Sequence, residues 1–161
     1  MRGRFLVSIF LMMSPFFVWG ATFPWQLLSS PQNLFAYLES QKVNNQDYCE
    51  LDIFGIPSRE YYWTDRYSAN ISIRYGGLET SYESLDDAEN IINSLTDNIL
   101  SQIPNQNDVR VGKDVPTIGN CNGNAIFNLT SGYTICIYKD INSKNKFDIV
   151  LRISYTNISP F

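Results

Sequence analysis

An alternation of apolar and polar side chains between residues 61 and 75 limits the fold more than any other feature of this chain. The apolar side chains stand at odd positions: Tyr61, Trp63, Tyr67, Ala69, Ile71, Ile73 and Tyr75. Because successive side chains of a strand point to opposite faces, the pattern predicts a strand with one buried face. Asp65 is the one charge at these positions, so we expect a bulge or bend there. Gly76 and Gly77 fit a tight hairpin turn, which predicts a returning strand through residues 78–82.

Shorter alternations predict further strands at residues 49–53, 109–111, 125–129, 133–137 and 147–155. Residues 112–124 are rich in Gly, Asn and Pro, which predicts a long loop between two of these strands. Long loops on a rigid sheet often carry binding sites, so this loop is a candidate surface. Residues 140–145 predict a plain hairpin loop. Their resemblance to a calcium loop fails at Lys144, where a third oxygen ligand is needed.

Two helices are predicted from their start signals and their apolar spacing. Ser30-Pro31 places a capping hydroxyl before a proline, which predicts a helix over residues 31–42. Ser84 and Asp87 match a capping box, which predicts a second helix over residues 84–103. Side chains at spacings of three and four form the apolar stripe of that second helix: Ala88, Ile91, Ile92, Leu95, Ile99 and Ile103.

The order of these elements is one helix, three strands, a second helix and four strands. Runs of strands joined by tight turns favour antiparallel pairing. Alternation with a single apolar face indicates that the other face of the sheet is solvated or binds a ligand. We therefore expect an α+β fold, in which a curved antiparallel sheet of about six to seven strands packs against two helices. The length predicts a single domain over residues 21–161.

The first 20 residues have the layout of a secretory signal peptide. Arg2 and Arg4 precede an apolar stretch over residues 5–19. The residues before Ala21 are small or are tolerated at signal-peptide cleavage sites, which predicts cleavage ahead of Ala21. An uncleaved anchor is the alternative, but the stretch is shorter than the ~20 residues that span a bilayer. We expect export to the periplasm or the extracellular space, without stable membrane insertion after cleavage.

The composition of the remaining chain excludes one class of partner. Cleavage removes two of the 12 basic residues and none of the 16 acidic ones, which takes the formal charge from −4 to −6. An acidic chain without a Lys/Arg cluster is a poor nucleic-acid binder, because phosphate contacts supply most of that affinity. Asn70, Asn128 and Asn157 begin glycosylation triplets, which matter only in a eukaryotic host.

Three cysteines would meet an oxidising compartment after export, so a disulfide is predicted. Cys121 and Cys136 close the shortest loop and are the first candidate pair. Cys49 is the alternative partner for either of them. An odd number leaves a third thiol, or a thiol that pairs with another chain.

The chain contains no histidine. This excludes Ser-His-Asp and Cys-His catalytic sets and the usual zinc sites with histidine ligands. Asp86, Asp87 and Glu89 are explained as charges at the positive end of a helix dipole. Glu50 and Asp52 lie two residues apart on one solvated strand face. We therefore predict no catalytic residues, no metal site and no cofactor.

The stretch from residue 59 to residue 67 suggests binding. It holds four aromatic residues and two arginines, and Tyr, Trp and Arg are the residue types that dominate binding hot spots. The candidate binding residues are Arg59, Tyr62, Trp63 and Arg66. By the alternation Tyr62 and Arg66 point outward, whereas Trp63 lies on the core-facing side. Core packing explains the same aromatic pattern, because aromatic residues favour strands.

These features predict a small exported binding protein without catalytic activity. Its partner would be another protein. The chain would bind this protein as an inhibitor, an immunity protein or an envelope accessory factor does. One alternative is a secreted carboxylate-dependent hydrolase acting on glycans, which needs two carboxyl groups beside a cleft. Another is a carrier of a small ligand, which needs an enclosed apolar cavity. No stretch carries a motif specific enough to identify a family.

Overall fold

The computed structural model describes residues 21–42, 47–64, 68–77, 80–117 and 121–156. The predicted signal peptide, Arg66 and Asn157 lie outside the described residues. Two α-helices and two short 3-10 helices are present: α1 (Pro31–Gln41), α2 (Leu85–Gln102), η1 (Trp25–Leu27) and η2 (Gln106–Asp108). The strands are β1 (Ala21–Thr22), β2 (Cys49–Ile53), β3 (Ile56–Thr64), β4 (Ser68–Arg74), β5 (Val109–Thr117), β6 (Cys121–Asn128), β7 (Tyr133–Ile141) and β8 (Phe147–Thr156).

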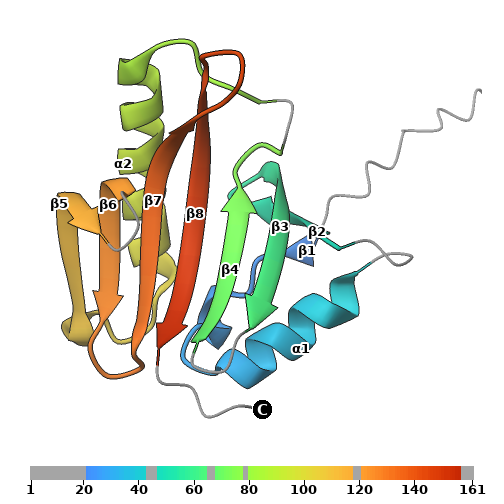
Figure 1. The fold of residues 1–161 in the computed structure, drawn as a ribbon. Helices are drawn as coiled ribbons and strands as arrows, with labels where there is room; N and C mark the ends of the chain where they lie inside the picture. The colour runs from blue at the N-terminus through green and yellow to red at the C-terminus, as the bar shows by residue number, and fades with distance from the viewer. Residues whose placement is uncertain (1–20, 43–46, 65–67, 78–79, 118–120, 157–161) are drawn as a thin grey trace, which may run out of the picture.

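The strands form a single open sheet of eight strands in the order β1-β2-β3-β4-β8-β7-β6-β5 (Figure 1). Every neighbouring pair is antiparallel except β1 and β2, which run parallel. The α+β class and the sheet packed on two helices are therefore confirmed. The sheet is larger than expected because β1 adds a parallel edge strand and β3 and β4 are separate strands.

The long alternation belongs to a hairpin rather than to a single strand. In this hairpin Thr64 pairs with Ala69, and Arg59 pairs with Arg74. Cross-strand partners share a face of the sheet, and here each odd-numbered residue is opposite an even-numbered one. The core-facing side chains are therefore even-numbered in β3 and odd-numbered in β4. The prediction that one register continues through the whole stretch is wrong, because β3 and β4 run antiparallel to each other.

The predicted hairpin at Gly76 and Gly77 is also corrected. Both residues adopt positive φ, at 74° and 69°, and the Gly77 N–H donates to the Arg74 carbonyl at 3.1 Å, so a turn does form. The chain does not return beside β4, because β8 occupies that edge. Among the described residues after the turn, Tyr82 makes an isolated bridge with Phe147.

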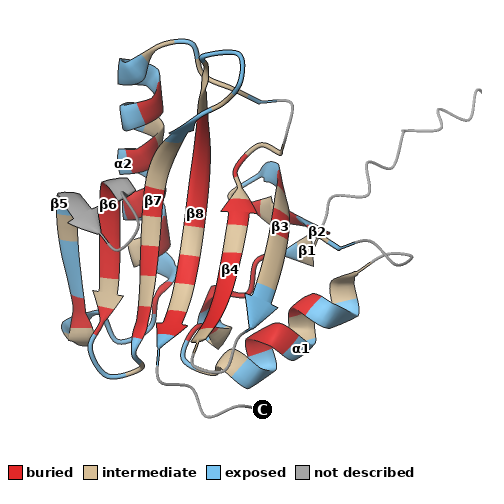
Figure 2. Ribbon diagram, viewed as in Figure 1, coloured by how far each residue is buried: buried red, intermediate tan, exposed pale blue. Residues whose placement is uncertain are grey.

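Both helices and η1 pack on one face of the sheet and share one core (Figure 1). The buried residues of α1 and α2 are Leu34, Phe35, Leu38, Ala88, Ile92, Leu95, Thr96 and Ile99. In Figure 2 buried and less buried positions alternate along β7 and the second half of β8, as expected for a sheet covered on one side, whereas residues 148–151 of β8 are all buried. The Tyr155 hydroxyl donates to the Leu28 carbonyl at 2.8 Å and ties β8 to η1.

The helix starts differ in how they are capped. Ser84 Oγ accepts the Asp87 N–H at 3.0 Å, which confirms the predicted cap of α2. Ser30 makes no side-chain cap, although Pro31 does begin α1. The start of α1 therefore depends on the fixed φ of proline, and the predicted hydroxyl cap is not present.

No described helix combines the length and the apolar character that a membrane span requires.

The predicted loop over residues 112–124 is mostly strand. β5 and β6 continue their pairing through this stretch, with a register shift between Gly112 and Val115. Gly123 lies within β6, where glycine is needed for close strand packing and does not mark a loop. A Cβ at this position would lie 2.1 Å from the Ile137 carbonyl oxygen of β7, so only glycine allows the two backbones to approach this closely.

The strand register does not allow the predicted disulfides. Cys136 pairs with Ala125, and Cys121 lies four residues further along β6, a backbone separation of about 13 Å. Cys49 is on β2, and three strands separate β2 from β7, which corresponds to ~19 Å. A disulfide needs Cα atoms within about 7 Å. The Cys49 thiol instead donates to the Leu38 carbonyl at 3.1 Å.

Two of the three glycosylation triplets are buried. Asn70 and Asn128 are 7% and 8% exposed. Asn70 Oδ1 accepts the Ser154 hydroxyl at 2.9 Å, and Asn128 Oδ1 accepts the Ser131 N–H at 2.6 Å. Both side chains therefore serve the fold and are closed to glycan attachment once the chain has folded.

Candidate functional site

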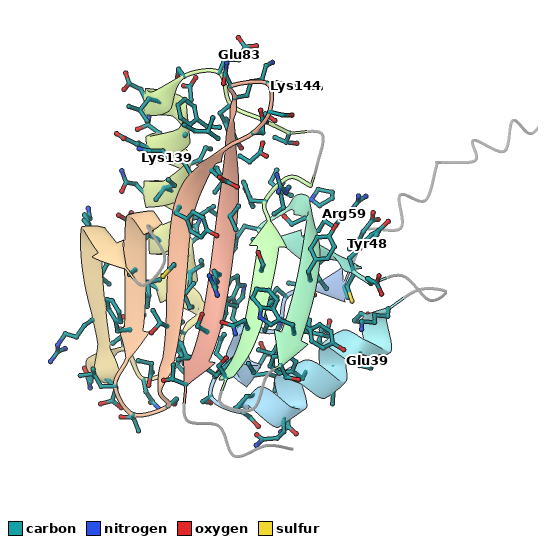
Figure 3. All side chains as sticks on the ribbon, in the orientation of Figure 1. Glu39, Tyr48, Arg59, Glu83, Lys139 and Lys144 are labelled. Atoms are coloured by element: carbon teal, nitrogen blue, oxygen red, sulfur yellow. The ribbon has the colours of Figure 1, made fainter. Side chains whose placement is uncertain are left out.

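The face of the sheet opposite the helices carries a group of aromatic and arginine side chains. We define the aromatic–arginine face as Tyr48, Arg59, Tyr61, Trp63 and Arg152. Tyr48 precedes β2, and Arg152 lies on β8. The other three occupy odd positions of β3, so the hairpin register points them away from the core. Figure 3 shows Tyr48 and Arg59 together near the β2–β3 edge.

Direct contacts order this face. The Arg59 guanidinium lies 4.3 Å from the centre of the Tyr48 ring, and the Tyr48 and Tyr61 rings are 5.8 Å apart. Arg59 Nη2 also donates to Glu50 Oε1 at 3.1 Å. The Arg152 guanidinium lies 5.5 Å from the centre of the Trp63 ring. Cations over aromatic faces are attractive contacts, so these side chains are held in place before any partner binds.

Trp63 is the exposed centre of this arrangement. It is 41% exposed, although tryptophan is usually well buried. Arg59 and Arg152 each have a buried Nε that finds no hydrogen-bond partner among the described residues. An exposed indole beside an arginine is suited to recognition, because tryptophan and arginine are the residue types that dominate binding hot spots and a partner could cover the ring.

The structure brings together two of the four predicted binding residues. Arg59 and Trp63 lie on the aromatic–arginine face. Tyr62 points to the other side, where its ring is 5.0 Å from Phe35 and the Lys42 amine is 4.4 Å from its centre. The outward placement of Tyr62 and the core placement of Trp63 are both corrected, because the hairpin exchanges odd and even positions between β3 and β4.

Tyr48 and Arg152 were missed by the sequence reasoning. Arg152 stands in the polar register of its strand, which is the one signal that could have drawn attention to it. It reaches Trp63 because β8 pairs with β4 and β4 pairs with β3, and this strand order is not visible in the alternation.

A buried acid lies on the helix-covered side. Glu60 is fully buried, and neither carboxyl oxygen has a hydrogen-bond partner among the described residues. Burial raises the pKa of Glu60 to about 8, and the nearby charge of Lys42 only partly opposes this. Glu60 pairs across the sheet with Cys49, whose pKa burial raises to about 11. A thiol with so high a pKa is a poor nucleophile at neutral pH.

A polar pocket of about 490 Å³ lies at the end of the sheet where the β7–β8 loop meets residue 81. Its buried carboxylate is Asp148, which forms an ion pair with Arg74. The predicted hairpin loop is confirmed, since Ile141 pairs with Phe147. Asn142 within it contacts Asp148, with its Nδ2 donating to Oδ1 at 3.0 Å.

Two chemical alternatives find no support in the described part of the chain. Three surface pockets there are each lined by a single carboxylate, Asp148, Glu89 or Asp108, whereas glycan hydrolysis needs a pair. The described residues contain no group of three potential metal ligands. The sheet is open, with β1 and β5 at its two edges, and does not close into the barrel that would surround a small ligand.

Comparison with known protein families, with curated proteins and with solved structures finds no match to this chain.

Proposed function

We propose that this chain is an exported binding module without catalytic activity, and that it binds another protein through the aromatic–arginine face. The observation that carries the proposal is Trp63, a 41% exposed indole held against Arg152 on the uncovered face of the sheet. Tryptophan, tyrosine and arginine are the residue types that contribute most to protein-binding hot spots.

The scaffold favours binding by this face. Arg59, Tyr61 and Trp63 project from one strand that is paired on both sides, with β2 and with β4. Side chains on a rigid strand lose less entropy on binding than side chains on a mobile loop. Arg152 forms no ion pair with a described residue, so its charge favours a partner that offers a carboxylate beside an apolar surface.

The test compares two exposed apolar residues at different places. Trp63→Ala removes the centre of the face, and Leu129→Ala removes a side chain that is 67% exposed outside it. Residues 21–161 carrying a tag are expressed in the envelope of the native host, the captured protein is identified and purified, and its affinity is measured by calorimetry. We expect Trp63→Ala to weaken binding by about 2 kcal/mol or more, and Leu129→Ala to change it little.

A loss of partner affinity in Arg152→Ala similar to that in Trp63→Ala would place the partner on the same face. Equal losses for Trp63→Ala and Leu129→Ala would contradict the proposal, because they would indicate a general loss of folding. Unchanged affinity for Trp63→Ala with a purified partner would assign binding to another surface.

A further inference from the structure

A second candidate site lies in the polar pocket at the end of the sheet, where its Arg74 is the cross-strand neighbour of Arg59. Its volume of about 490 Å³ falls within the range of small-molecule sites. It is formed by the end of β4, the start of β8, the loop between β7 and β8, and Ser81. In Figure 3 Glu83 and Lys144 lie at this end of the molecule.

The pocket has a rigid polar frame. The Asp148 side chain is only 6% exposed. Its Oδ1 accepts the Ser81 hydroxyl at 2.8 Å and the Asn142 amide at 3.0 Å, and its Oδ2 accepts the Arg74 guanidinium. Asn142 Oδ1 accepts the backbone N–H groups of Lys144 and Lys146, at 2.9 and 3.1 Å. One amide side chain thus joins the buried carboxylate to the loop and fixes the backbone of both lysines.

The charge of the pocket is opposite to that of the chain. Arg74, Lys144 and Lys146 line it, against the one carboxylate of Asp148. That carboxylate is already satisfied by internal donors, so it presents little negative charge to the pocket. The lining residues carry an excess of two positive charges, or one when Glu83, the partner of Lys146, is counted, whereas the chain charge is −4. An anionic ligand is therefore favoured here.

The two lysines are available to a ligand. Lys146 Nζ is 2.8 Å from Glu83 Oε1, but that glutamate side chain is 82% exposed. Such a pair contributes little in water and exchanges readily for a stronger anion. Lys144 forms no ion pair with any described residue.

We propose that this pocket binds the phosphate monoester of a small polyhydroxy compound. A phosphate monoester carries close to two negative charges at neutral pH, which matches the local excess of positive charge. The pocket is larger than one phosphate group needs. The hydroxyl and amide groups of Ser81, Ser143 and Asn142 also line it, and they suit a body that is rich in hydroxyl groups.

The experiment titrates the folded chain with glucose 6-phosphate, glucose and inorganic phosphate by calorimetry at constant ionic strength. We expect saturable binding of glucose 6-phosphate, weaker binding of inorganic phosphate and none of glucose. The double variant Lys144→Ala/Lys146→Ala should bind at least about tenfold more weakly. The control Arg110→Ala/Lys113→Ala removes the same charge from exposed positions on β5 and should bind as the wild type does.

The variant Asn142→Ala tests the effect of the hydrogen-bonded frame on ligand binding separately from the effect of the positive charges. It keeps every cation but releases the loop, so we expect it to weaken binding while circular dichroism shows an unchanged fold. No saturable binding of glucose 6-phosphate across the millimolar range would overturn the proposal. Equal losses in the two double variants would also overturn it, since they would show nonspecific attraction. Equal affinities for glucose 6-phosphate and inorganic phosphate would overturn the assignment to an ester.

Discussion

Replacing Glu60 by glutamine should make the protein more stable at neutral pH and leave its stability nearly unchanged in mild acid. Glutamine has the same shape and cannot ionise. Glu60 is fully buried, with no hydrogen bond to either oxygen from a described residue. Burial raises its pKa from 4.5 to about 8 in the folded protein. The folded state therefore keeps a proton that the unfolded state releases above its lower pKa.

The sign and size follow from this difference. Between the two pKa values the native state binds more protons than the unfolded state, so stability falls as the pH rises. Each pH unit in this window removes about 1.4 kcal/mol. At about pH 7 the wild type has therefore lost ~3 kcal/mol that the Glu60→Gln variant retains, and the loss levels off at ~5 kcal/mol above about pH 8.

Urea unfolding of both proteins at intervals between about pH 5 and about pH 9 measures this difference. Glu50→Gln is the matched control, because Glu50 lies on the neighbouring strand with a 64% exposed side chain. Its substitution should change stability by less than about 1 kcal/mol throughout. Lys42, Cys49 and Tyr37 also titrate or carry charge near Glu60, and both proteins retain them. Parallel stability curves for wild type and Glu60→Gln would refute the reasoning.

Three further predictions concern the cap, a close backbone contact and processing. Ser84→Ala removes the acceptor of the Asp87 N–H and should cost about 1 kcal/mol in chemical unfolding, whereas Ser84→Asp should keep the cap. Gly123→Ala places a methyl group against the Ile137 carbonyl oxygen and should cost more than about 3 kcal/mol or prevent folding, as judged by circular dichroism. N-terminal sequencing of the envelope form should begin at Ala21, and a full-length chain retained in the cytoplasm would contradict the predicted export.

The fold could be predicted where local signals agree. The start signal and apolar stripe of α2 identified it closely, because capping and spacing both act within a few residues. The alternation in β8 was equally clear, because it runs without a turn. The β3–β4 hairpin was missed because Trp63 and Ile71 are both odd-numbered members of one continuous pattern. Nothing local shows that the chain reverses between them.

The candidate sites could be predicted less well, because they depend on contacts between distant strands. Trp63 and Arg59 were selected for their residue types, but Arg152 joins them only through the strand order. Glu60 was not selected, because a charged residue in a strand ordinarily faces solvent. Asp148 and Ser81 meet across 67 residues of chain, which no spacing rule covers.

The position of β8 has a consequence for the time at which the protein can fold. β8, the last described strand, lies in the middle of the sheet between β4 and β7. It contacts β4 through residues that are far apart in the sequence, such as Asn70 and Ser154, which are separated by 84 residues. Until β8 emerges, β1–β4 and β5–β7 remain two separate groups of strands with unpaired edges. Folding that waits for such a distant contact is slow. Under the proposed export, this strand order would keep the chain open until β8 has crossed the membrane.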